Sequence, residues 1–254
     1  MAKFKTKEEI ELLRESGKRL AAVLQAVKAE IKPGVTTAYL DQVAERLIRE
    51  GGDTPPFKNY TPHGARKPFP AALCVSVNDE IVHGIPGDRV LNEGDIVSID
   101  LGLTHKGMIT DAALTVPVGK IPPPLAKLLE ETERGLYEGI RVAKVGARIG
   151  DIGAAIEKVA HTHGYGIVRE LGGHGVGHAV HEDPYVPNYG SKGTGPLLKS
   201  GMVLALEPMF MLGAEDISIL PDGYTIITED GSLSAHFEHT IVITESGPEI
   251  VTTL

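Results

Sequence analysis

The chain has 254 residues, of which 42% are hydrophobic, enough for a substantial core in one large domain or two small ones. Its 25 basic and 34 acidic residues give a net charge of −9 without a basic run, which argues against nucleic-acid binding as the main role. A single cysteine, Cys74, excludes an internal disulfide framework. The charged start MAKFKTKEEIELL and the lack of an apolar run of about 18 residues predict a soluble, cytoplasmic protein without a membrane segment.

Amphipathic periodicity predicts two pairs of helices. A capping box at Thr6-Lys7-Glu8-Glu9 begins the first helix, and Lys32-Pro33-Gly34 ends it. Further helices are expected at 40–48, at 125–145 and, with Asp151 as the capping residue, at 152–163. The order helix, Lys-x-Gly, helix, strands therefore occurs twice, which indicates an internal duplication.

The stretch 94–118 carries two unusual aspartates. It predicts two strands joined by a turn at 105–107, with Asp100 and Asp111 where core-facing apolar residues are expected. A carboxylate buried in a sheet is costly unless a cation neutralises it, and no lysine or arginine lies close in sequence on the same strand. A metal ion is one interpretation. The other is that both aspartates cap turns at the rim of the sheet.

The same pattern recurs in the second half of the chain. Aligning LNEGDIVSIDLG with LKSGMVLALEPM pairs Asp100 with Glu207, and aligning DAALTV with EHTIVI pairs Asp111 with Glu238. A duplicated unit folded about a pseudo-twofold axis would bring these carboxylates together, where they repel one another unless cations hold them. Carboxylate clusters coordinate hard or borderline divalent metals, so the repeat favours a metal site.

A hairpin is predicted ahead of this stretch. It follows a loop at 54–70 that is rich in proline, glycine and aromatic residues, and its turn is expected at Asn78-Asp79. His83 lies where the second strand runs into Gly84-Ile85-Pro86. A lone histidine at a strand end is most often structural or exposed, but its nearness to the aspartates favours a place at the site.

The densest histidine segment is LGGHGVGHAVHEDP, which contains His174, His178 and His181. Their spacing matches a helical zinc motif, but the density of glycine opposes a helix and indicates irregular or extended chain. The glycines also let the backbone approach an occupied site closely. Since His181 lies opposite His83 in the two halves, one histidine from each half would flank the metals.

The motifs SIDLG, TDAA, GHGVGHAVHEDP, LEPM and FEHT occur in this order over nearly the whole chain. Together they resemble the type I methionine aminopeptidases, in their bacterial single-domain form. The resemblance implies an α+β pita-bread fold, in which two pseudo-twofold-related α/β halves surround a central antiparallel sheet. It also implies one catalytic domain over 1–254, with halves at about 1–120 and 121–254.

The resemblance implies two divalent metal ions, with Asp111 and Glu238 bridging them. Asp100 would complete one side, and His174 with Glu207 the other. Cobalt, manganese, iron, zinc and nickel all suit such donors. The implied reaction is hydrolytic removal of the initiator methionine from nascent proteins whose second residue is small, by a bridging water that both metals activate.

Catalytic roles follow from the same resemblance. Glu207 would carry a proton between the bridging water and the leaving amine, although as a ligand it could have no further part. His181 would hydrogen-bond the scissile carbonyl or its developing oxyanion, and His83 would contact the peptide nitrogen on the leaving side. His178 is expected to support the site or to be exposed rather than to bind metal.

The methionine pocket is expected to be apolar and to lie beside the metals. Its walls would come from the following residues: Phe69, Cys74, Val180 and Tyr224. His63 and Arg66 depart from the smaller or aromatic residues common in the family, which affects the shape of the pocket. Cys74 is not expected to act as a nucleophile, because no Cys-His-Asn arrangement is evident.

Three functions compete on the sequence alone. The first is the methionine-specific enzyme; the second is an X-Pro peptidase of the same fold, whose relatives usually carry a further N-terminal domain. The third is a pita-bread module that has lost its metals and binds peptides, which predicts broken ligand positions. The expected partner is the N-terminal methionine of peptides and nascent chains, with the ribosome as a candidate. We expect a monomer that binds neither membranes nor specific nucleic acid.

Overall fold

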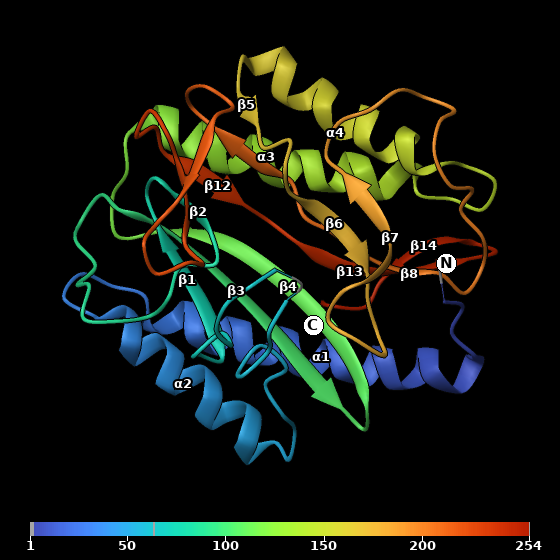
Figure 1. The fold of residues 1–254 in the computed structure, drawn as a ribbon, viewed down its shortest axis with the longest axis horizontal. Helices are drawn as coiled ribbons and strands as arrows, with labels where there is room; N and C mark the ends of the chain where they lie inside the picture. Colours follow the sequence, from blue (N-terminus) through green and yellow to red (C-terminus); the bar gives the residue numbers. More distant parts are fainter. Residues whose placement is uncertain (1–2, 63, 254) are drawn as a thin grey trace.

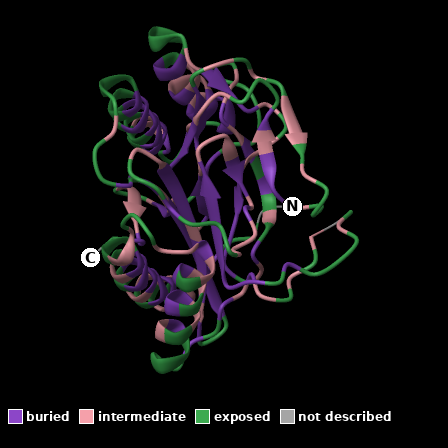
Figure 2. Cartoon of the chain, turned by 90° about the vertical axis from the view of Figure 1, so that its left-hand side faces the viewer, coloured by how far each residue is buried: buried purple, intermediate pink, exposed green. Residues whose placement is uncertain are grey.

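A computed structural model describes residues 3–62 and 64–253. It contains four long helices and a set of central strands. The helices form two pairs, which lie above and below the strands in Figure 1 and on the same side of them in Figure 2. The helices are α1 (Lys7–Glu30), α2 (Thr37–Glu50), α3 (Pro123–Val142) and α4 (Ile149–His163). The strands are β1 (Leu73–Val77), β2 (Glu80–Val82), β3 (Ile96–His105), β4 (Met108–Pro117), β5 (Gly166–Ile167), β6 (Gly172–Gly175), β7 (Glu182–Pro187), β8 (Val203–Leu206), β9 (Met209–Met211), β10 (Ile217–Ile219), β11 (Ile226–Thr228), β12 (Ser234–His236), β13 (His239–Thr244) and β14 (Gly247–Ile250).

The predicted helix pairs are present, and α1 and α2 begin with side-chain caps from Thr6 and Thr36. The capping box of α1 is confirmed, because Thr6 Oγ1 accepts from the amide of Glu9 and Glu9 Oε2 accepts from the amide of Thr6. The expectation for α4 was wrong in detail. Asp151 lies inside the first turn, where its carboxylate accepts from the amide of Arg148, and the helix begins at Ile149.

The β3–β4 hairpin places the two unusual aspartates on one face. Lys106 and Gly107 form its turn, with φ of 48° and 84°, as a two-residue hairpin turn requires. The register sets Asp100 opposite Ala113, two residues from Asp111 along the same strand. The carboxylates are therefore diagonal neighbours on the same side of the sheet.

The other predicted hairpin is only partly as expected. Its turn at Asn78-Asp79 is present, and Asn78 has a φ of 64°. The flanking strands form ladders with other elements, since β1 pairs with β3 and β2 pairs with β11 from the second half. This long-range pairing carries the segment that ends in His83 across to the other half of the molecule.

The two halves meet where β4 runs beside β13 (Figure 1). The amide of Asp111 donates to Thr240 Oγ1, and this hydroxyl donates in turn to the carbonyl oxygen of Asp111. On the far side of β13, β8 and then β6 and β7 continue an antiparallel sheet, with β14 at its other edge. The centre of the molecule is thus built from antiparallel strands of both halves.

Each half has its own apolar core against its helices. One cluster joins α1 and α2 to β3 and β4, and another joins α3 and α4 to β8 and β13. Leu114 on β4 packs against both clusters, and the central strands are buried nearly along their length (Figure 2). Within the described residues, no helix is both long and apolar enough to cross a membrane.

Candidate metal centre

One cavity of about 110 Å³ collects every residue for which the sequence predicted a metal, catalytic or pocket role. These residues come from both halves and from loops as well as strands. They are Phe69, Cys74, His83, Asp100, Asp111, His174, Val180, His181, Glu207, Tyr224 and Glu238. Phe57, Tyr60 and Pro62 complete the lining.

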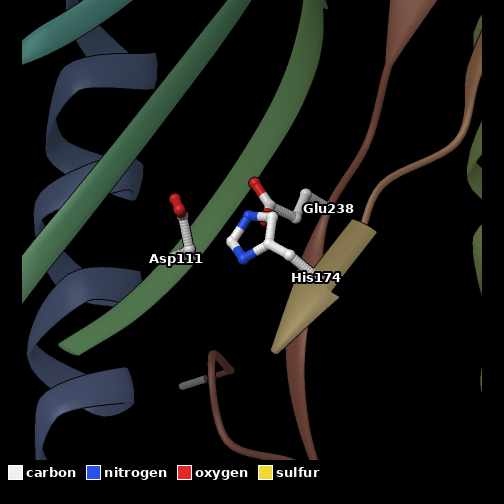
Figure 3. A group of neighbouring side chains, drawn as sticks. All are labelled: Asp111, His174 and Glu238. Carbon is white, nitrogen blue, oxygen red and sulfur yellow. The ribbon is translucent and has the colours of Figure 1, made fainter. Parts of the chain in front are cut away.

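Three donors form the tightest group in this cavity (Figure 3). Asp111 on β4, His174 on β6 and Glu238, which directly precedes β13, offer ligand atoms that all lie within 4.8 Å of one another. The group joins an aspartate of the first half to a glutamate and a histidine of the second. Asp100 and Glu207 line the same cavity beyond this group.

The donors suit a divalent cation. Asp100 Oδ1, Asp111 Oδ1 and Glu238 Oε1 are buried and have no hydrogen-bond partner among the described residues. No lysine or arginine of the described chain lines the cavity. Buried carboxylates without partners are costly, and carboxylates with one imidazole are typical ligands of divalent transition metals.

The carboxylates also destabilise each other's charge. Burial, followed by the charges of Asp111 and Glu207, raises the pKa of Asp100 well above its usual value. Burial raises the pKa of Asp111 to about 7, and burial with the charge of Asp111 raises the pKa of Glu207 to about 8. The pKa of Glu238 is raised well above its usual value by burial and by the other three. A bound cation would reverse this preference for the protonated forms.

Glu207 is placed by a break in the sheet. It follows β8 and precedes Pro208, which has no amide to continue the ladder, and Asn188 Nδ2 donates to its carbonyl oxygen at 3.0 Å. Its carboxylate lies between two imidazoles, 3.5 Å from His174 Nε2 and 3.9 Å from His236 Nε2. The repeat thus predicted the place of Glu207, although Asp100 lies within a strand and Glu207 at a break between strands.

His83 and His181, the two histidines expected to flank the metals, line the same cavity. The rings of His174 and His181 meet edge to face with centroids 4.4 Å apart. Burial, followed by the charge of His181, lowers the pKa of His83 to about 4, so His83 is neutral near pH 7. Tyr60 places its hydroxyl 2.9 Å from Nδ1 of His181. A hydroxyl that donates to Nδ1 leaves the imidazole proton on Nε2.

Aromatic and small residues form the apolar wall. Phe69 and Tyr224 pack edge to face at 5.2 Å, and Cys74 lies opposite Asp100 in the β1–β3 ladder. Burial and the neighbouring carboxylates raise the pKa of the Cys74 thiol well above its usual value, which fits a packed residue rather than a nucleophile. Arg66 is exposed and is not among the lining residues, while His63 lies outside the described residues.

The histidine segment is extended and irregular, as expected. Gly172–Gly175 forms β6, and His178 lies at the surface with Nε2 2.7 Å from Glu9 Oε1. Two residues of the site were missed from the sequence. Tyr60 lies in a loop without periodicity, whereas His236 could have been found, because it is two residues from Glu238 and therefore shares its side of the extended chain.

The sequence profile of metallopeptidase family M24 matches residues 11–245. The chain belongs to metallopeptidase family M24. This M24 chain is 48% identical over 248 residues to methionine aminopeptidase 1 of Bacillus subtilis, covering 98% of each chain. The solved methionine aminopeptidase of Thermotoga maritima is 41% identical, with a TM-score of 0.96 and full coverage of both chains. The prolidase of Pyrococcus furiosus shares the fold, with a TM-score of 0.78, 24% identity and coverage of 99% of this chain and 65% of its own.

Membership of M24 makes the chain a metal-dependent hydrolase, and the pita-bread fold expected from the sequence is confirmed. The loss of metal-binding residues predicted for a pure binding module is not found. All the donors expected from the sequence line one cavity, and three of them form a group of metal-ligand dimensions.

Proposed function

We propose that this M24 chain is a methionine aminopeptidase, which hydrolyses the bond after the N-terminal methionine of peptides and new proteins whose second residue is small. The observation that carries the proposal is the small cavity in which apolar side chains, among them Phe57, Phe69 and Val180, lie beside the candidate metal donors. The near-complete match to relatives named methionine aminopeptidase supports the same substrate.

The shape around the donors supports cleavage at a chain end. The cavity of about 110 Å³ has room for one side chain. A second, more open cavity of about 570 Å³ shares His83, His174, His181 and Glu207 with it. We propose that the methionine side chain enters the small cavity and that the rest of the peptide leaves through the open one. His174 and Glu207, the two donors that line both cavities, then lie at the junction, where the scissile bond would be.

We further propose that Asp111 and Glu238 bridge two divalent ions, with Asp100 on one side and His174 with Glu207 on the other. Such ions supply Lewis acidity to the scissile carbonyl and lower the pKa of a water molecule. The oxygens of Asp100, Asp111 and Glu238 support this set, because one oxygen of each is buried without a hydrogen-bond partner among the described residues and is therefore available to a cation.

The remaining polar residues act on the peptide itself. With Nδ1 of His181 occupied by the Tyr60 hydroxyl, its Nε2–H is the donor available to the scissile carbonyl oxygen. His83, neutral because burial lowers its pKa to about 4, contacts the peptide nitrogen on the leaving side. Glu207, with its pKa raised to about 8 by burial in the metal-free protein, is the group proposed to carry a proton to that nitrogen.

The test compares three peptide substrates. Met-Ala-Ser should be hydrolysed in the presence of manganese, cobalt, iron, zinc or nickel, and a chelator should stop the reaction. N-acetyl-Met-Ala-Ser should not be cleaved, since a blocked amine has lost the group by which the substrate is held. Turnover of Ala-Pro-Ala in preference to Met-Ala-Ser would instead assign the X-Pro activity. Calorimetric titration of the metal-free protein should give two ions per chain.

The oligomeric state, the cellular location and the partner of the enzyme belong to the same proposal. We propose a monomer that acts in the cytoplasm on chains emerging from the ribosome. Light scattering of the purified protein tests the first statement, and cosedimentation with translating ribosomes at low and moderate salt tests the last.

A further inference from the structure

A buried ion pair joins the N-terminal segment to the segment that carries His181. Lys5 Nζ lies 2.6 Å from Glu182 Oε2, and the two side chains are only 1% and 3% exposed. The residues are 177 positions apart in sequence. Removing two charges from water is expensive, and breaking such a pair leaves an uncompensated buried charge. The pair therefore keeps the Glu182 carboxylate, and the groups that hydrogen-bond to it, in a fixed position.

Glu182 holds the turn that precedes it. Its second oxygen, Oε1, accepts from the amides of His178 at 2.7 Å and Ala179 at 3.0 Å. One carboxylate thus fixes both ends of the turn 178–182, and His181 lies within that turn, one residue before β7. Any movement of the Glu182 side chain is transmitted to His181 through a few backbone bonds.

Lys5 is itself held from both sides. Its amide donates to the carbonyl oxygen of Gly201 at 2.8 Å, which ties the N-terminal segment to the turn that precedes β8 (Figure 1). Its side chain passes so close to Gly177 that a Cβ at that position would overlap Lys5 Cε. Gly177 in turn accepts from the amide of Ile109 at 2.7 Å. The lysine is packed between fixed parts of both halves.

We propose that Lys5 is a positioning residue for the peptidase reaction. Acting through Glu182, it holds the turn 178–182 so that the His181 ring stays packed against His174 beside the metal donors. The proposal rests on the proposed function, since it concerns the residue that binds the scissile carbonyl. It assigns a part in the chemistry to the N-terminal segment, whose described residues 3–6 do not line the cavity.

The physical reason is the cost of an unpaired Glu182. Without the Lys5 ammonium group, Oε2 loses its close partner, and the other contacts of the carboxylate, with Lys3 at 4.0 Å and with the His178 ring at 3.5 Å, are to Oε1. The carboxylate is then drawn toward water, and the turn moves with it. Asp100 and Asp111 lie on the β3–β4 hairpin, and His174 lies on β6, so these donors are held by other elements. Loss of Lys5 should therefore lower kcat while leaving bound metal unchanged.

The test uses the full chain loaded with metal. Lys5→Met keeps the aliphatic stem beside Gly177 and removes the charge, and Lys5→Arg keeps the charge. Lys3→Met is the matched control, because Lys3 Nζ lies 4.0 Å from the other oxygen of Glu182 on a side chain that is 57% exposed. Lys5→Met should lower kcat on Met-Ala-Ser on the order of tenfold, below the 10²- to 10³-fold expected for complete loss of an oxyanion donor. Lys5→Arg should recover part of this loss, and Lys3→Met should match the wild type.

A double variant separates positioning from general destabilisation. If Lys5 acts through His181, Lys5→Met adds no further loss of kcat in a His181→Ala background. Independent losses that multiply would overturn the proposal. So would a Lys5→Met protein that loses metal, or one whose kcat equals that of the wild type.

Amide hydrogen exchange gives a readout that does not depend on activity. In Lys5→Met, the amides of His178 and Ala179 should exchange faster, with the amides of β3 and β4 unchanged. Unchanged exchange at 178 and 179 would show that the Lys5–Glu182 pair does not hold this turn. Failure of the wild type to cleave Met-Ala-Ser would count against the proposed function instead, because the exchange result reports on the pair either way.

Discussion

The amide of Glu238 donates a hydrogen bond to the carbonyl oxygen of Ala113 at 2.8 Å. Together with the paired bonds between Asp111 and Thr240, it joins the second half of the chain to the first. These bonds form the seam between the two halves, and they lie at Asp111 and Glu238, the residues proposed to bridge the metals. The backbone of the seam therefore holds these two residues close together.

Glu238→Gln or Asp111→Asn should abolish metal-dependent activity without unfolding the protein. A neutral amide retains the shape of the side chain but is a poor metal ligand. The loss of kcat/KM should therefore exceed the roughly 10- to 100-fold loss that is typical when a residue hydrogen-bonded to a ligand is replaced. Peptide hydrolysis and metal content check this, with circular dichroism as the control for folding. Wild-type turnover by either variant in metal-replete buffer would remove the bridging assignment.

Glu207→Gln should change how the metal-free protein responds to pH. Burial raises the pKa of Glu207 from 4.5 to about 8, so the folded state holds this proton more tightly than the unfolded state. Its contribution to stability is complete below about pH 4.5 and is lost as the pH rises to about 8. With chelator present, the Tm of the wild type should therefore fall relative to Glu207→Gln across this window. A difference in Tm that stays constant with pH would show that Glu207 does not titrate there.

His83→Ala should lower the rate while leaving bound metal almost unchanged. Since His83 is proposed to contact the leaving nitrogen, the loss of kcat should be roughly 10- to 100-fold, at or below the lower end of the 10²- to 10⁴-fold range of a full acid–base group. Steady-state kinetics with parallel metal analysis decides the matter. A large loss of metal would make His83 a ligand instead.

Tyr60→Phe should weaken catalysis through His181. The variant keeps the ring but removes the hydroxyl that lies 2.9 Å from Nδ1, so about two- to tenfold of kcat should be lost. The effect should disappear in a His181→Ala background. An equal effect there would place the Tyr60 hydroxyl in direct contact with the substrate.

Gly173→Ala should destabilise the protein beside the metal site. A Cβ at Gly173 would overlap the carbonyl oxygen of Ala205 on β8, and neither backbone can move freely. We expect a loss of about 1–3 kcal/mol in the free energy of unfolding and weaker metal binding at the adjacent His174. The control is Gly87→Ala, because a Cβ at Gly87 meets nothing within 4 Å; its cost should stay within about 0.5 kcal/mol in denaturant titrations.

The donors were predictable because each breaks a local rule. Asp100 and Asp111 interrupt apolar strands, and the repeat then identifies Glu207 and Glu238, so no knowledge of distant contacts is needed. The amphipathic helices were equally legible, since periodicity and caps are local. The features that the sequence did not predict depend on contacts between distant parts of the chain. The pairing of β2 with β11 joins segments about 145 residues apart, and no local pattern encodes that register.

Tyr60 and Lys5 escaped for a related reason. A tyrosine in an aperiodic loop and a lysine ahead of a helix look ordinary until the fold brings His181 to one and Glu182 to the other. His236 could have been found from its spacing to Glu238, but its place 3.9 Å from Glu207 Oε2 depends on the fold. Sequence reasoning thus reached the candidate metal donors and missed Tyr60 and Lys5, whose contacts join residues that are far apart in the chain.

The seam at Ala113 and Glu238 also makes the protein a natural candidate for division into two separately expressed pieces. The first fragment would carry Asp100 and Asp111 and the edge strand β4, and the second would carry His174, Glu207 and Glu238. Cobalt or manganese would then promote association of the two fragments by binding ligands from both. Recovery of peptide cleavage would measure this association. A chelator added to such a two-piece enzyme should release the fragments from each other.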